Sequence, residues 1–177
     1  AADAPARRRH PPDVAGPCDD PCVPVDFTAI DFETANSSGG VRVLRRAREG
    51  AGGGDVVDRA YWLLRPPFPH DEFHEWNVRI HGITPEMVAG AATWAESLGE
   101  FRAFAEDDWL VAHNASFDMG VVAKSCEAFG VDAPNHLYLC SLQVARKTYR
   151  LDSYRLPVAA MAAGFEDFSH HNALDDA

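Results

Sequence analysis

Short apolar runs in the first half of the chain have the spacing of β-strands. Residues 25–33 pass from an apolar run, Phe27–Ile30, into acidic residues, which predicts a buried strand with charged residues at its end. Val56–Leu64 alternates apolar and polar positions, which predicts a further strand. Between these two runs only Val41–Leu44 is strand-like, among arginines and glycines. We therefore expect the sheet edge there to be short, shifted or disordered.

Apolar residues in the second half recur at helical spacing, alternating with short apolar runs. Thr93 followed by Glu96 is a capping box, and Thr84 followed by Pro85 is a second helix start. The further predicted helices are Phe117–Phe129, Leu142–Tyr149 and Tyr154–Ala163, and the further predicted strands are Trp109–Ala112 and Leu137–Cys140. Strands first, then strands alternating with helices, predict an α/β fold with a mixed central sheet flanked by helices.

Composition divides the chain into a leader and one domain. Residues 1–24 are rich in Ala, Pro and Arg without apolar periodicity, which predicts a disordered leader. Residues 25–177 are long enough for one domain with its own core. The chain stops one residue after Asp176, within a pattern typical of a helix start. We therefore expect a domain truncated at its C-terminus.

Charge and hydropathy narrow the class of protein. Hydrophobic residues make up 46% and charged residues 24%, and no apolar run approaches the ~20 residues that a membrane span needs. The N-terminal residues do not resemble a secretory signal, and the spacing of the four cysteines does not indicate a disulfide framework. We therefore expect a reduced, cytoplasmic protein with no membrane partner. The formal net charge of −11 argues against wrapping of duplex nucleic acid by a broad basic face. It is compatible with an enzyme that grips only one strand end.

Acidic residues recur at positions that a fold can bring together. Asp31 and Glu33 lie two apart on a strand, so their side chains share one face. Asp118 falls in the first turn of a predicted helix, and Asp176 lies near the chain end. Taken alone, the pair Asp31 and Glu33 is more often a solvated strand end, Asp118 could belong to a helix cap, and Asp176 could belong to a polar chain end.

Converging carboxylates repel one another unless cations are bound. Oxygen ligands without thiolates favour magnesium or manganese over zinc. Two such ions about 4 Å apart stabilise both oxygens of an in-line phosphoryl displacement, which is the hydrolysis of a phosphodiester. The attacking water requires a base that is neutral near pH 7, and histidine suits that task. His170 and His171 both precede Asp176, and the spacing alone does not choose between them.

Three segments together carry a family resemblance. They are Asp31-Phe32-Glu33-Thr34, His113-Asn114-Ala115-Ser116-Phe117-Asp118 and His171-Asn172-Ala173-Leu174-Asp175-Asp176. They resemble the exonuclease motifs of the DEDD superfamily in its histidine branch, which includes the proofreading epsilon subunit of bacterial DNA polymerase III and ribonuclease T. Asn77 to Glu86 also resembles the segment before the first long helix of epsilon-like domains, so the similarity covers most of Phe27 to Ala177.

The resemblance implies a ribonuclease H-like fold and 3′-to-5′ release of nucleoside monophosphates with two Mg²⁺ or Mn²⁺ ions. By position it makes His171 the general base, and it implies that Thr34 and Phe117 hold the terminal nucleotide. A core role for Phe117 remains equally open, and we expect His113 and Asn114 to shape the turn. The implied metal ligands are Asp31, Glu33, Asp118 and Asp176.

The substrate and partners remain open at this point. The first hypothesis is an exonuclease acting on single-stranded DNA 3′ ends, with a DNA polymerase as a possible partner. The second is the same chemistry on RNA 3′ ends, as in ribonuclease T or oligoribonuclease. The sequence does not decide between DNA and RNA, since it identifies no residue that contacts the 2′-hydroxyl. The third, of another class, is a non-catalytic module that docks on a polymerase and retains a relic site.

Overall fold

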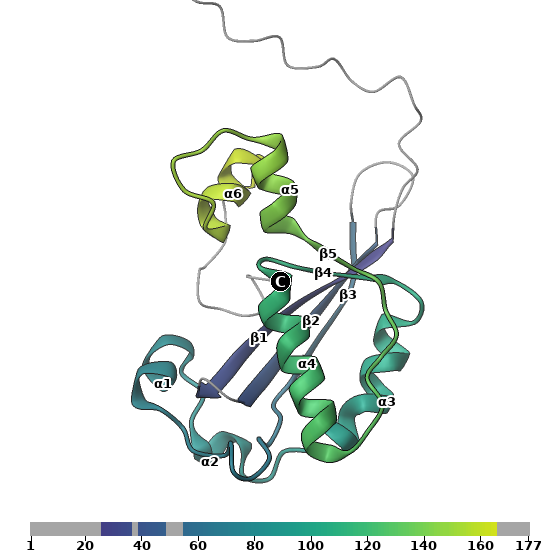
Figure 1. Cartoon of the computed structure of the whole chain (residues 1–177), viewed down its shortest axis with the longest axis vertical. Coiled ribbons are helices and arrows are strands. Elements are labelled where there is room, and N and C mark those ends of the chain that lie inside the picture. Colours follow the sequence, from purple (N-terminus) through teal and green to yellow (C-terminus); the bar gives the residue numbers. More distant parts are fainter. Residues whose placement is uncertain (1–25, 37–38, 49–54, 166–177) are drawn as a thin grey trace, which may run out of the picture.

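A mixed β-sheet forms the centre of the molecule. The computed structural model describes residues 26–36, 39–48 and 55–165, whose strands form a five-stranded sheet in the order β3-β2-β1-β4-β5 (Figure 1). The predicted leader and the C-terminal motif with His171 and Asp176 lie outside the described residues. Within the described part, none of the helices has the length and apolarity to cross a bilayer.

The strands pair in two ways, as predicted for a mixed sheet. β1 (Phe27–Asn36) pairs antiparallel with β2 (Gly39–Arg48), which pairs antiparallel with β3 (Asp55–Trp62). On its other side β1 pairs parallel with β4 (Trp109–Ala112), which pairs parallel with β5 (Tyr138–Cys140). β1 is therefore the central strand.

β2 differs from its prediction. A short, shifted or disordered sheet edge was expected around Val41–Leu44, whereas β2 spans 10 residues and pairs with both neighbours. Pairing on two sides satisfies backbone groups that local sequence preference leaves open, so tertiary context overrides the weak β-propensity.

Most of the helices follow their sequence signals. α3 (Trp94–Ala105) begins with the capping box of Thr93 and Glu96. α4 is Ala115–Phe129, α5 is Ser141–Thr148 and α6 is Leu156–Ala162. α2 (Pro85–Val88) begins after Thr84, which makes no side-chain capping bond. α1 (Glu75–His81) was not predicted, since none of its residues is buried and it shows no apolar face.

The core lies between the sheet and two helices. Ile30 and Phe32 on β1 are buried at 1% and 3% exposure and belong to one apolar cluster with residues of α3 and α4, among them Phe101 and Val122. Figure 1 shows α3 and α4 together on this side of the sheet. Because side chains alternate along a strand, Asp31 and Glu33 project from the opposite face.

Pairing between β1 and β4 stops before the acidic residues. Its register runs only from Phe27–Trp109 to Ala29–Val111. Beyond Ala29, β4 no longer pairs with β1, so the next element in the chain can approach this edge of β1. That element is the start of α4.

Candidate active site

Asp118 joins the start of α4 to the middle of β1. Its side chain is 2% exposed, and its Oδ1 accepts a hydrogen bond of 3.1 Å from the backbone N–H of Phe32. The acceptor thus takes the place that a β4 residue would occupy had the pairing continued. The carboxylate therefore lies at the backbone between Asp31 and Glu33, 86 positions away in the sequence.

A left-handed turn aims Asp118 at the strand. Asn114, the N-cap of α4, has φ 73° and ψ 47°, a conformation that asparagine tolerates better than most residues. The Phe117 N–H donates to the Asn114 carbonyl at 2.8 Å and closes the first turn. Asp118 then points inward, whereas Phe117 is 47% exposed. Phe117 is therefore not a core residue.

The three described acids supply only oxygen donors, which suit a hard divalent cation. Asp31 and Glu33 are half-buried on one face of β1, with Asp118 at its edge. Among the residues that the structure describes, no group of three or more His, Cys, Asp and Glu side chains is placed so that it could hold a metal ion. The donor chemistry fits the expected ions, while the fourth acid, Asp176, lies outside the description.

Thr34, directly after the acids, is fixed by α1. The Asn77 side-chain amide donates to the Thr34 carbonyl at 2.8 Å and to its hydroxyl oxygen at 3.2 Å. The His81 Nε2 lies 3.2 Å from the same carbonyl, and its Nδ1 accepts the Ile83 N–H at 3.0 Å. With Nδ1 as acceptor, the Nε2 carries the proton and donates to Thr34. Burial lowers the pKa of His81, against a smaller opposing effect of this bond to Thr34.

These two residues were not singled out from the sequence as site residues. Asn77 and His81 lie four positions apart, so they face the same side of α1. That spacing within the Asn77–Glu86 segment was the available signal. Its meaning required knowledge that α1 packs against β1, which the structure provides.

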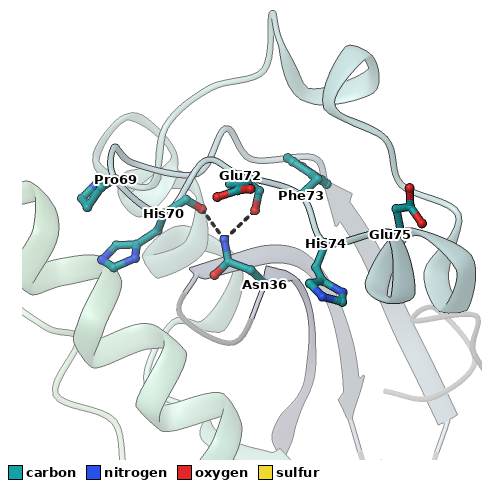
Figure 2. Close-up of a pocket in the computed structure, with 7 residues that line it drawn as sticks. All are labelled: Asn36, Pro69, His70, Glu72, Phe73, His74 and Glu75. Carbon is teal, nitrogen blue, oxygen red and sulfur yellow. Dashed lines mark hydrogen bonds between the residues drawn. The ribbon is translucent and has the colours of Figure 1, made fainter.

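A pocket lies beyond Thr34 at the end of β1 (Figure 2). Its volume is about 510 Å³. The Asn36 amide lies under the segment that forms the pocket and donates to the carbonyls of His70 at 3.0 Å and Glu72 at 2.6 Å. The lining residues are Asn36, Pro69, His70, Glu72, Phe73, His74 and Glu75.

His113 anchors the end of β4 to the segment around α5. Its Nδ1 lies 3.0 Å from the Ser141 Oγ, and its Nε2 lies 2.8 Å from the Tyr154 carbonyl. Both ring nitrogens thus bind protein atoms, and the Tyr154 carbonyl only accepts, so Nε2 carries a proton. This arrangement agrees with the expectation that His113 shapes the local structure.

Of the seven predicted site residues, Asp31, Glu33, Thr34, Phe117 and Asp118 are described. Asp31, Glu33 and Thr34 lie on β1, Asp118 meets the edge of that strand at Phe32, and Phe117 precedes Asp118 in the first turn of α4. His171 and Asp176 lie outside the described residues, so their roles stay predictions.

Comparison with known proteins identifies the family. Residues 53–177 match the model of the RNase_T family, described as Exonuclease. The chain belongs to this exonuclease family. The resemblance seen in the motifs and the expected enzyme class of 3′–5′ exonuclease are thereby confirmed at the level of the family.

The curated relatives are long polymerases. The chain is 33% identical over 155 residues to the DNA polymerase III PolC-type of Thermotoga maritima, covering 85% of the chain and 11% of that protein. It is 31% identical over 159 residues to the protein of that name from Halalkalibacterium halodurans, covering 89% of the chain and 11% of that protein. The chain therefore corresponds to only a small part of these relatives.

Solved structures agree on the fold. Exonuclease X in complex with 5′ overhanging duplex DNA has a TM-score of 0.63 at 25% identity, covering 85% of this chain and 83% of that one. The nuclease domain of 3′hExo, a DEDDh family member bound to rAMP, has a TM-score of 0.72 at 15% identity, covering 88% and 87%. The ribonuclease H-like fold expected from the motifs is thus confirmed.

Proposed function

We propose that this exonuclease-family chain is a 3′–5′ exonuclease that releases nucleoside monophosphates from the 3′ ends of single-stranded DNA. The observation that carries the proposal is the Asp118–Phe32 hydrogen bond of 3.1 Å, which brings the acid of α4 to the two acids of β1. Such a group of carboxylates is costly unless a cation balances it.

Asp31, Glu33, Asp118 and Asp176 would hold two Mg²⁺ or Mn²⁺ ions. When bound, such ions stabilise the negative charge that develops on a phosphoryl group during hydrolysis. The chain's own part is to fix the carboxylates before substrate arrives. β1 fixes two of them through its central place in the sheet, and the Phe32 N–H holds the third.

Two described residues would hold the terminal nucleotide. The Thr34 hydroxyl oxygen already accepts from Asn77, so its own proton is directed elsewhere and suits donation to the 3′ end. Phe117 is 47% exposed and one residue from Asp118, which favours stacking on a base over packing in the core. His171 would remove the proton from the attacking water, since imidazole is the side chain whose pKa lies near neutral pH.

We further propose that the chain acts beside a DNA polymerase in the cytoplasm. Support comes from the relatives named DNA polymerase III PolC-type, of which this chain covers 11%. DNA is the favoured substrate for the same reason. Matched DNA and RNA oligonucleotides of one sequence would decide between the two sugars.

The decisive experiment measures the degradation of an end-labelled single-stranded oligonucleotide by the full-length protein in the presence of Mn²⁺. A 3′-terminal label should appear first as the mononucleotide, while a 5′ label should give a ladder that shortens with time. Asp31→Ala should abolish both, and Asp132→Asn, a change at an exposed acid outside the site, should not. Equal product from Asp31→Ala and the unmodified protein would refute the proposal.

A further inference from the structure

The face of the sheet that carries Asp31 and Glu33 continues onto the edge strand β3. Asp31 is opposite Val43 in the β1–β2 register, and Val43 is opposite Tyr61 in the β2–β3 register. Directly opposed residues share one face of a sheet, so Tyr61 projects on the side of the acids. By the same registers, Arg59 is aligned with Ala29 through Arg45 and projects on that side too.

The neighbouring residue confirms this assignment of faces. Trp62 packs edge-on against Phe104 of α3, with ring centroids 5.6 Å apart, and its Nε1 donates to Glu100 at 2.7 Å. It therefore belongs to the helix-covered side. Tyr61, next in the alternation, must point the other way.

Tyr61 and Arg59 are accessible to solvent, and the charge of Glu33 affects Tyr61. Tyr61 is 45% exposed, and Arg59 is exposed as well. Burial of part of the ring raises the pKa of Tyr61, and the negative charge of Glu33 raises it further. This effect agrees with the registers, which place Tyr61 on the same face of the sheet as Glu33.

Tyr61 and Phe117 lie on opposite sides of the acids. α4 approaches β1 from the edge that β4 occupies, whereas β3 lies beyond β2 on the other side. Strands are about 4.8 Å apart, so Tyr61 is about 10 Å across the sheet from Asp31. A strand whose terminal base is at Phe117 and whose scissile phosphate is at the acids would reach β3 with a nucleotide farther upstream.

We propose that Arg59 and Tyr61 form a contact surface on β3 for the upstream nucleotides of the single-stranded substrate, the ring stacking on a base and the guanidinium binding a phosphate. The inference rests on the proposed function. Aromatic stacking with a cation beside it is the usual chemistry of single-strand binding. Substrates long enough to reach this surface should bind more tightly than a mononucleotide ester, which does not reach it.

The test compares a single-stranded oligonucleotide with a chromogenic aryl ester of a nucleoside 5′-monophosphate, using the full-length protein. Tyr61→Leu should raise KM for the oligonucleotide about tenfold relative to KM for the ester, and Tyr61→Phe should restore it, since the ring still stacks. Arg59→Gln should reduce the slope of log affinity against log salt by about 0.7, the value for one phosphate contact on a single strand.

Tyr138→Leu is the matched control, because Tyr138 is an exposed tyrosine on the other edge strand and aligns with Thr28, on the opposite face. Its KM for both substrates should equal that of the unmodified protein. Equal KM ratios for Tyr61→Leu and the unmodified protein, with both substrates cleaved, would overturn the inference alone. Absence of cleavage of either substrate by the unmodified protein would instead contradict the proposed function.

Discussion

Replacement of Asp118 separates the structural role of this residue from its chemical role. A hydrogen bond from a backbone N–H to a charged acceptor contributes about 1.5–3 kcal/mol, and a buried donor left without a partner costs about 1–3 kcal/mol. Asp118 is 2% exposed, so water cannot replace it at the Phe32 N–H without rearrangement. We therefore expect Asp118→Ala to lower the free energy of unfolding by about 2–3 kcal/mol.

Asp118→Asn keeps an oxygen at the position that accepts from Phe32. It should lie within about 1 kcal/mol of the unmodified protein, because the lost charge–dipole attraction is offset by relief of repulsion among the carboxylates. Both variants should lower kcat at least about 100-fold, since ions held by the acids supply several kcal/mol of transition-state stabilisation. Stability and activity should thus diverge only in the Asn variant.

Urea unfolding followed by tryptophan fluorescence measures the first quantity, and mononucleotide release measures the second. For a domain of this size the loss in Asp118→Ala corresponds to a fall of about 4–12 °C in Tm. Equal stability of Asp118→Ala and the unmodified protein would show that the bond to Phe32 does not hold α4 to β1. Full activity of Asp118→Asn would show that the charge is not needed for the reaction.

Three further outcomes are expected. Burial lowers the pKa of His81 in the folded state below its unfolded-state value of about 6.5, so the free energy of unfolding should fall as the pH drops from 7 through the folded-state pKa. His81→Gln should reduce this pH dependence, measured by urea unfolding at several pH values. An unchanged pH dependence in His81→Gln would contradict the assignment to His81. Asn77→Ala removes both bonds to Thr34 and should cost about 1–2 kcal/mol in unfolding free energy together with a loss of kcat/KM, whereas a change in stability alone would argue against a role for Thr34. Phe117→Ala should raise KM for an oligonucleotide by the equivalent of about 1–3 kcal/mol while stability changes little, and a stability loss of about 3–5 kcal/mol would instead make Phe117 a core residue.

The central acids were predictable because their signal is local. Alternation along residues 27–33 places Asp31 and Glu33 on one face, and the helix start places Asp118 in a first turn. Each position follows from periodicity or capping alone. To bring Asp118 to Phe32, the fold needs in addition only the parallel pairing of β1 and β4. The alternation of strands and helices in the sequence already indicated such pairing.

Features that depend on contacts distant in sequence could not be predicted. The bonds from Asn77 and His81 to Thr34 join residues 43 and 47 positions apart, and the spacing of Asn77 and His81 does not reveal that partner. β2 was underestimated for a related reason: its arginines and glycines have poor β-propensity, and only pairing on both sides makes the strand. Likewise, the alignment of Tyr61 with Asp31 exists only through the β2 register.

The most direct measurement is anomalous diffraction from crystals of the full-length protein grown with Mn²⁺ and a nucleoside monophosphate. The expected result is manganese density contacted by the carboxylates of Asp31, Glu33 and Asp118, with the nucleotide's sugar near Thr34. Manganese bound elsewhere, or carboxylates of β1 and α4 that share no ion at saturating Mn²⁺, would contradict the proposed nuclease centre.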